Sequence, residues 1–272
     1  EWASLHVAAA LDGGWAPIDY PHLLMALEYR HSLTRWSTAT HLLDRLASAR
    51  PIDPLMADEV RRLRADHAVD QGFPAAAAQL FQTNGGLTRW WASPSQTIEE
   101  LGDFSSQAVL PAEDTVWRAT PGTDPLGWVQ IQGLAWPARR QMIHLATTVE
   151  SDALAPVAVR LGAAQVARVW LNGELLLTTD FPLRAAEDQI AAGGWLHAGS
   201  NSVVVAVASE SSDWWLRVRL TSPDGSALTG VRETDSRPES SEPVDRRRPD
   251  IRTLESEIRA DIAAGRPGAR LA

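Results

Sequence analysis

The main pattern in this chain is a series of short apolar runs between Gly85 and Leu220, separated by turn residues. These runs predict β-strands over 87–92, 127–132, 141–149, 157–161, 167–171, 174–178, 202–208 and 214–220. Several short strands joined by turns are typical of a β-sandwich or jelly roll. Both alternating sets of positions in 202–208 are apolar, so we expect this strand to lie centrally in its sheet.

Two turn signals define the connections in this region. Asn172-Gly173 joins two β-forming runs, and this dipeptide favours a type I′ hairpin because both residues accept positive φ. Gly199 to Asn201 precedes the predicted central strand and also reads as a turn. We therefore interpret both sites as structural turns, with contact to a ligand as the alternative.

The first 84 residues have a helical pattern instead. Apolar residues recur there at three-to-four spacing, at Leu23, Leu24, Leu27, Trp36, Leu42, Leu43 and Leu46. Asp53-Pro54 predicts a helix start, Gly72 its end, and Pro74 the start of another helix. Near the C-terminus, Leu254, Ile258 and Ile262 predict a helix over 251–264.

The predicted fold class is therefore α+β, with several domains. Helical hairpins occupy 1–86, an antiparallel β-sandwich or jelly roll 87–231, a disordered or extended linker 232–250, and a short helix 251–272 that could begin a further helical region. The linker is rich in Ser, Glu, Pro and Arg, so it has little apolar surface to bury.

Composition excludes several functions. The net charge of −9 argues against a nucleic-acid partner. The chain has no Cys and its 25 basic residues are all Arg, which excludes thiolate chemistry and lysine Schiff bases within it. No stretch approaches the roughly 20 apolar residues of a transmembrane helix. No signal peptide is visible, but the chain begins without Met, so we expect a processed or excised piece.

Tryptophan is unusually frequent, with 12 residues against 4 Phe and 2 Tyr. Trp fills protein cores, and it also anchors interfaces and offers a flat apolar face to a sugar ring. Trp215, Arg217 and Arg219 alternate along a predicted strand and therefore share a face, whereas Trp214 points to the other face. With Trp195 and Trp90, these three form the candidate ligand-binding set; the alternative is a set of core and surface residues.

Acidic residues offer two further hypotheses. Asp180, Glu187 and Asp188 follow the predicted hairpin and could bind calcium, although a solvated acidic loop is our preferred interpretation. A glycosidase acid pair could come from Glu99, Glu100 and Asp103, or from Glu113 and Asp114. The seven His residues show no metal-ligand spacing, so neither a metal nor a cofactor is predicted.

Several motifs resemble a galactose-binding-like β-sandwich. They are Leu87-Thr88-Arg89-Trp90, Leu126-Gly127-Trp128, Arg160-Leu161-Gly162, Val169-Trp170-Leu171-Asn172-Gly173, Asp188 and Leu196-His197-Ala198-Gly199-Ser200-Asn201. The sequence is similar to the version of this domain found among tetratricopeptide repeats in large bacterial envelope-type proteins, some with a transglutaminase-like domain. Ala65, Ala77 and Phe81 match part of one such repeat. Transglutaminase activity cannot lie in this chain, because that chemistry needs a Cys.

The sequence thus favours a non-catalytic scaffold or recognition module of a larger envelope or secreted bacterial protein. Its partners would be another protein or neighbouring domains of the same polypeptide. The first alternative is a carbohydrate-binding module that uses exposed Trp residues. The second is a carboxylate-dependent glycoside hydrolase fragment. A periplasmic, envelope-associated or secreted location follows from the resemblance.

Overall fold

A computed structural model describes residues 36–48, 53–99, 104, 109–137, 139–179, 184–212, 214–239 and 241–265. The chain forms two compact units. Unit 1 combines the residues up to Asn84 with 224–226 and 252–272, and unit 2 comprises Gly85–Pro223 and Ala227–Ile251. The helix predicted around Leu23 to Leu27 lies outside the described residues.

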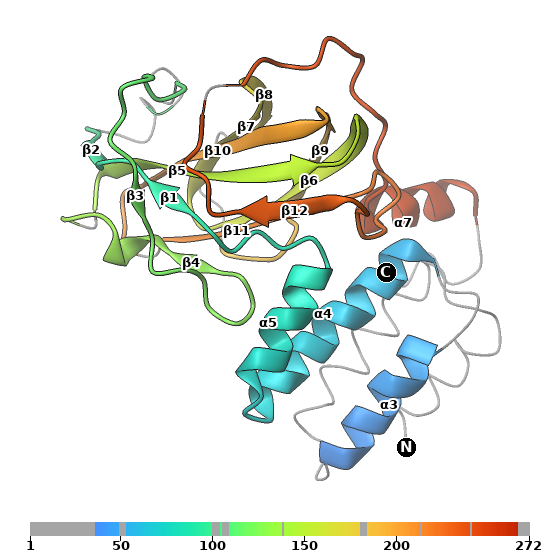
Figure 1. The fold of residues 1–272 in the computed structure, drawn as a ribbon. Helices are drawn as coiled ribbons and strands as arrows, with labels where there is room; N and C mark the ends of the chain where they lie inside the picture. The colour runs from blue at the N-terminus through green and yellow to red at the C-terminus, as the bar shows by residue number, and fades with distance from the viewer. Residues whose placement is uncertain are drawn as a thin grey trace. The chain divides into compact units, whose positions relative to one another are not determined.

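Unit 1 contains the predicted helices. They are α3 (Trp36–Ser48), α4 (Pro54–Asp70), α5 (Pro74–Thr83) and α7 (Leu254–Ala263) (Figure 1). The side chain of Asp53 accepts a hydrogen bond from the backbone N–H of Leu55, so the predicted start of α4 is confirmed. In α7, Thr253 and Ser256 cap the first turn reciprocally.

The three residues of the repeat-like pattern are all buried. Ala65 lies on α4, Ala77 and Phe81 lie on α5, and none is more than 4% exposed. Small side chains at such positions let two helices approach closely. This burial fits a packed helical pair, and the assignment to a tetratricopeptide repeat stays a prediction.

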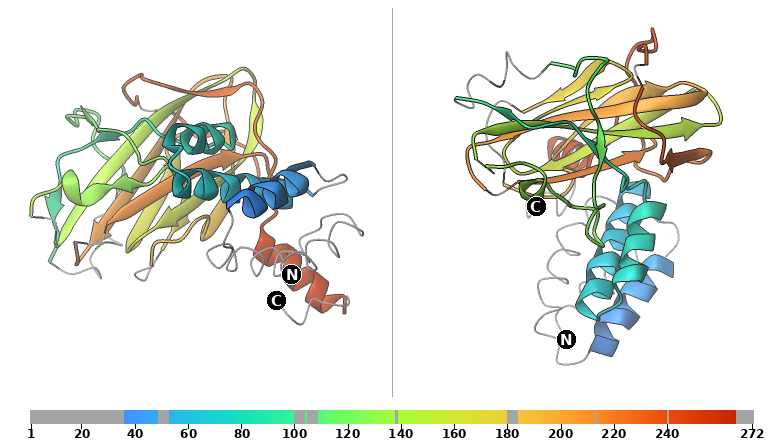
Figure 2. Two further views of the ribbon diagram at one scale, coloured as in Figure 1. Left: turned by 90° about the horizontal axis from the view of Figure 1, so that it is seen from below. Right: turned by 60° about the vertical axis from the view of Figure 1, so that its left-hand side comes forward.

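Unit 2 is a sandwich of two antiparallel sheets, as the sequence predicted (Figure 1, Figure 2). One sheet has the strand order β3-β1-β5-β10-β7-β8, and β2 and β12 also pair with β5; the other has the order β4-β11-β6-β9. The strands are β1 (Trp91–Ala92), β2 (Gln96–Thr97), β3 (Arg118–Ala119), β4 (Val129–Gln130), β5 (Gln141–Ser151), β6 (Ala155–Ala163), β7 (Val166–Leu171), β8 (Glu174–Thr178), β9 (Ile190–Leu196), β10 (Gly199–Ser209), β11 (Trp215–Thr221) and β12 (Val231–Thr234). A 3-10 turn, η4 (Ile131–Gly133), follows β4.

The central position of the strand after Asn201 is confirmed. β10 pairs with β5 on one side and with β7 on the other. Val203, Val205 and Val207 point into the main core between the two sheets. Val204 and its alternating neighbours instead join a second, smaller core on the outer face of the larger sheet. A strand buried on both faces needs apolar side chains on both, which explains its continuous run.

The two predicted turns are joined by a buried pair of asparagines. Asn172 adopts φ +49° and Gly173 φ +79°, as a type I′ turn requires. The side-chain amide of Asn172 donates to Oδ1 of Asn201 at 2.8 Å. Asn201 Oδ1 also accepts from the backbone N–H of His197, and its amide donates to the carbonyls of His197 and Gly199. The asparagines therefore tie the Asn172-Gly173 turn to the start of β10, and that turn is confirmed. The turn predicted at Gly199 to Asn201 is wrong: these residues are the first three of β10, because β5 is long enough to pair with them through residues 149–151.

A second polar anchor is Glu233 on β12. Its carboxylate accepts hydrogen bonds from the backbone N–H groups of Thr88 and Arg89 and from the hydroxyls of Thr88 and Thr147. These bonds fasten β12 to the segment that enters the sandwich.

Four of the described strands were not predicted: the two-residue strands β2 and β3, and the longer β9 and β12. The Gly193-Gly194 pair beside Trp195 predicts a turn, but all three residues lie inside β9. The expectation was wrong because these glycines serve close packing: a Cβ on Gly194 would lie 2.8 Å from Leu171, and one on Gly193 would lie 2.2 Å from the carbonyl oxygen of Pro249. β12 was missed because its polar sequence gives no strand pattern.

Beyond β12 the chain forms an extended strap, which we define as residues 235–239 and 241–250. The sequence left open whether this segment is disordered or extended, and the structure places it along unit 2. The ring of His197 donates to the carbonyl of Glu242 (2.7 Å), and Arg248 forms an ion pair with Glu174 (2.6 Å). Backbone and charged groups hold the strap, so its lack of apolar residues does not prevent docking.

Among the described residues, none of the helices combines the length and apolar character that a membrane span requires.

Candidate functional site

The candidate site lies on the outer face of the larger sheet in unit 2. The side chains of β10 that point outward are Ser202, Val204, Ala206 and Ala208. Ile98, Phe104 and Trp170 cover part of this face as a second core, and Trp117 packs against it. The Ser202 end of β10 is instead the floor of a pocket.

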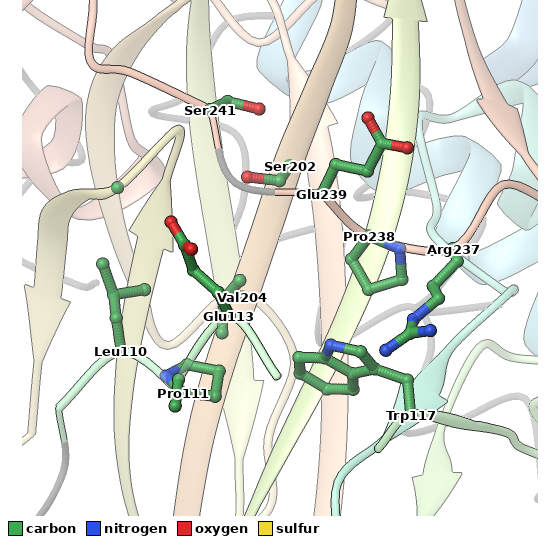
Figure 3. Close-up of a pocket in the computed structure, with 12 residues that line it drawn as sticks. Leu110, Pro111, Glu113, Trp117, Ser202, Val204, Arg237, Pro238, Glu239 and Ser241 are labelled. Carbon is green, nitrogen blue, oxygen red and sulfur yellow. The ribbon is translucent and has the colours of Figure 1, made fainter. Parts of the chain in front are cut away.

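This pocket has a volume of about 410 Å³ and lies between two irregular segments. Segment 109–117 forms one side and strap residues 237–239 and 241 form the other, as Figure 3 shows. The lining residues are Leu110, Pro111, Ala112, Glu113, Trp117, Gly173, Ser202, Val204, Arg237, Pro238, Glu239 and Ser241. A cavity at the small end of the range for organic ligands, about 300–1,000 Å³, suits a small ligand.

A buried histidine positions the first of these segments. His144 on β5 is 3% exposed, and its Nε2–H donates to the carbonyl of Val109 at 2.8 Å. Burial lowers the pKa of His144, and the hydrogen bond to Val109 opposes this only in part. The ring is therefore neutral near neutral pH and donates as a fixed anchor.

The second side of the pocket is tied to the first through Arg237. Its Nη2 donates to the carbonyl of Thr115 at 2.7 Å, so the guanidinium bridges the strap and segment 109–117. Pro238 is buried beneath this contact. The two segments thus close over β10 without any strand pairing between them.

Most polar side chains of the pocket have no partner within the described chain. The hydroxyl of Ser202 makes no hydrogen bond there, although the residue is only 4% exposed. Glu113, Glu239 and Ser241 make no side-chain hydrogen bond or ion pair there either. Buried polar groups are normally paired, so the hydroxyl of Ser202 in a pocket wall is available to a ligand.

The apolar wall completes the site. Trp117 is half-buried, and Leu110, which is 40% exposed, lies across from it with Pro111. An aromatic ring beside carboxylates, hydroxyls and a guanidinium can bind a ring that has both a C–H face and a hydroxyl edge.

The predicted set Trp215, Arg217 and Arg219 does share a face, on the outside of the smaller sheet. That face is not open, because Arg217 and Arg219 are 4% and 3% exposed. Arg217 is ion-paired with Glu187, and Arg219 with Asp188.

The electrostatics of this face bear out the pairing. Burial alone would raise the pKa of Asp188, but the charges of Arg219, Arg217 and Arg160 outweigh it and lower that pKa to about 2. Arg217 also lies over the ring of Trp128, 5.9 Å from its centre. The arginines therefore hold the loop at 184–189 in place, and ligand binding by Trp215, Arg217 and Arg219 stays a prediction.

The other two predicted ligand residues are also occupied. Trp90 is 2% exposed within the main core, and its indole N–H bonds the carbonyl of Leu87. Trp195 donates its indole N–H to the carbonyl of Arg247 at 2.9 Å, and Arg246 lies over its ring at 5.1 Å. Trp90 fills the core and Trp195 receives the strap; ligand binding by these residues stays a prediction.

The structure also places most of the acidic residues considered for a calcium site or a glycosidase acid pair. Glu187 and Asp188 pair with arginines, Asp180 lies outside the described residues, and the described part of the chain holds no group of three metal-ligating side chains. Of the glycosidase candidates, Glu113 lines the pocket and Asp114 does not, while Glu100 and Asp103 lie outside the described residues.

Comparison with known proteins gives only weak structural likenesses. No protein family and no curated protein matches the sequence. The PA14 domain of the antifreeze protein MpAFP is 13% identical at a TM-score of 0.27, over 30% of this chain and 43% of that one. A family 35 carbohydrate-binding module from Clostridium thermocellum is 14% identical at 0.25, over 30% and 71%. A β-glucosidase from Kluyveromyces marxianus is 12% identical at 0.34, over 65% and 18%.

This chain spans less than half the length of the PA14 and β-glucosidase chains. The neighbours include carbohydrate-binding modules and glycosidases. Because identities and TM-scores are this low, function has to be derived from the residues of the pocket itself.

Proposed function

We propose that unit 2 is a non-catalytic carbohydrate-recognition module whose ligand binds in the pocket on the outer face of the larger sheet. The observation that carries this proposal is the pairing of an aromatic wall, Trp117, with a buried hydroxyl, Ser202, that has no partner in the described chain. A sugar ring stacks its C–H face on an indole and needs hydrogen-bond partners at its edge.

The pocket's composition supports a polyhydroxylated ligand over an apolar one. Glu113 and Glu239 are acceptors only, the two serines both donate and accept, and Arg237 donates. Neighbouring hydroxyls of a sugar can bond to such a mixture, whereas an apolar ligand would leave these groups unpaired. The site of the proposed module therefore differs from the Trp215 face that the sequence suggested.

The test is titration of the chain against a panel of soluble mono- and oligosaccharides, followed by intrinsic Trp fluorescence and calorimetry. We expect saturable binding that Trp117→Ala weakens by about tenfold or more. Ser202→Ala removes one hydrogen bond at little risk to the fold and should weaken binding about threefold to tenfold.

Two matched Trp variants serve as controls. Trp136→Ala removes a ring that is 91% exposed and outside the pocket, and Trp215→Ala removes the ring that the sequence favoured. Both should leave the affinity within about twofold. Loss of binding in Trp215→Ala but not in Trp117→Ala or Ser202→Ala would overturn the pocket assignment, and no binding across the panel would overturn the function.

For unit 1 we propose a scaffold role, in which the helices contact a protein partner or a neighbouring domain. The buried small residues Ala65 and Ala77 support close helix packing of the repeat type. Cross-linking mass spectrometry of the chain within its native host would test this role. Cross-links from 36–83 to another polypeptide or domain would support it, and their absence would count against it.

A glycoside hydrolase is the second candidate, favoured by one observation: Glu113 and Glu239 line the same pocket from different segments. Two carboxylates are what most glycosidases use as acid and base or nucleophile. Release of reducing ends from a bound glycan, abolished in Glu113→Gln and in Glu239→Gln, would establish this activity. Intact glycan after prolonged incubation would support the non-catalytic proposal.

A further inference from the structure

We propose that the pocket selects a glycan with a free amino group, an amino sugar, over neutral and acidic sugars. This inference rests on the proposed function and adds the ligand class to it. The lining of the pocket has an imbalance of charge: two carboxylates and one guanidinium lie around Ser202, the largely buried polar residue of its floor.

The carboxylates are free to act on a ligand. Glu113 comes from segment 109–117 and Glu239 from the strap, so they approach the pocket from its two sides, with Ser202 between them in the view of Figure 3. Both are exposed, and neither forms an ion pair or side-chain hydrogen bond with the described chain. Their charges are therefore not compensated by partners of their own.

The one cation of the pocket is already in use. Arg237 donates through Nη2 to the carbonyl of Thr115 at 2.7 Å, which fixes its guanidinium against segment 109–117. With two negative charges and one positive, the pocket lining has a net charge of −1. The whole chain adds a field of the same sign, with a net charge of −9.

Ser202 is the independent sign that a ligand belongs here. Its hydroxyl lies on the floor of the pocket in a residue that is 96% buried, and it makes no hydrogen bond to the described chain. Acidic residues on a surface loop are commonly only solvated, but Ser202 is a largely buried residue whose unpartnered hydroxyl opens into the pocket, where a ligand can bond to it. The acidic walls and this hydroxyl face the same space.

The chemistry then discriminates between sugars. An ammonium group donates three hydrogen bonds and carries a positive charge, so it complements carboxylates that can only accept. A neutral hydroxyl makes the same contact without the charge. A uronate would bring a third carboxylate into the pocket beside Glu113 and Glu239, and like charges repel. The expected order of affinity is amino sugar, neutral sugar, uronate.

The experiment is calorimetric titration with three matched β-1,4-linked disaccharides, of glucosamine, glucose and glucuronate. Measurements at pH 6, in low and in high salt, keep the amine protonated and report the charge contribution. The variant is Glu113→Gln/Glu239→Gln. The control is Asp114→Asn/Glu242→Gln, which removes two nearby exposed carboxylates that do not line the pocket.

We expect the glucosamine disaccharide to bind about fivefold tighter than the glucose disaccharide, the size of effect that exposed charge pairs give. The preference should disappear in the pocket variant, persist in the control, and shrink at high salt. Glucuronate should bind weakest.

Two failures can be told apart. If the neutral disaccharide binds and depends on Trp117 but the amino sugar has no advantage, the amino-sugar inference is wrong while the module remains a glycan binder. If none of the three binds, and the wider panel gives no binding either, the proposed function itself is overturned. A preference that survives in the pocket variant would place the selectivity elsewhere and also refute this inference.

Discussion

Asn201 should be among the most costly polar residues of the sandwich to replace. Its side chain is 1% exposed and uses all of its hydrogen-bonding capacity on the Asn172 side chain and the backbone of 197–199. Asn201→Ala leaves the buried Asn172 amide and three partly buried backbone groups without that partner. The expected result is a large loss of stability in unit 2 with little change in surface properties.

The magnitude follows from counting the bonds. Each net hydrogen bond contributes about 1 kcal/mol, so four give about 4 kcal/mol, and the unpaired N–H of His197 adds to this cost. That is a large share of the 5–15 kcal/mol by which a typical domain is stable. For a unit of this size it corresponds to a fall in Tm of about 10 °C.

Urea unfolding followed by Trp fluorescence measures the effect, because most tryptophans lie in unit 2 and Trp214 is fully buried. The midpoint should fall while the slope with urea stays constant. Ser200→Ala, at the exposed neighbouring position, should change stability by less than about 0.5 kcal/mol. A free energy of unfolding for Asn201→Ala within about 1 kcal/mol of the parent chain would refute the reasoning.

Three further predictions concern charged groups. The pKa of Asp188 is lowered from 3.8 to about 2, so the stability that this carboxylate contributes is complete above about pH 4 and is lost as the pH falls through 2. Between pH 5 and pH 2, the free energy of unfolding measured with urea should fall by about 2 kcal/mol more in the parent chain than in Asp188→Asn. Equal losses in the two chains would contradict this prediction. Glu233→Gln puts an amide N–H group against backbone N–H groups, so it should lower the stability measured by thermal unfolding by about 1–3 kcal/mol. Glu150→Gln on β5 is the control and should leave the stability unchanged. Equal effects of the two substitutions would count against Glu233 as an anchor. Arg248→Ala removes the ion pair with Glu174, so trypsin should cut the strap at its arginines about fivefold faster, and an unchanged rate would show that this contact does not hold the strap.

The sequence was a good guide to the sandwich where local pattern and burial agree. The apolar run of β10 and the turn at Asn172-Gly173 were both predictable, because each depends on residue types within a few positions. The start of α4 at Asp53 was predictable for the same reason, because an N-cap depends only on neighbouring residues. The strand β9 was missed because its glycines are selected by what packs on them, and Pro249 and Leu176 come from distant parts of the chain.

The candidate site was much less predictable. Glu113 was noted as a carboxylate, but its pairing in one pocket with Trp117 and Glu239 depends on a strap that has no apolar pattern. For the arginines of β11, the alternation of residues correctly predicted a shared face. The same pattern cannot show that the loop carrying Asp188 covers that face. Contacts between irregular segments leave no periodic signal, and the pocket consists mainly of such segments.

The two segments that enclose the pocket have a consequence for how its specificity can change. Segment 109–117 and strap residues 237–239 and 241 lie outside the ladders of paired strands, whereas the floor belongs to β10, which is paired on both sides. Substitutions and insertions in such segments cost a scaffold little, as in antibody loops carried by a sandwich. The sandwich therefore offers a graft site: exchanging these two short stretches as a pair should give a library of binders on one unchanged framework.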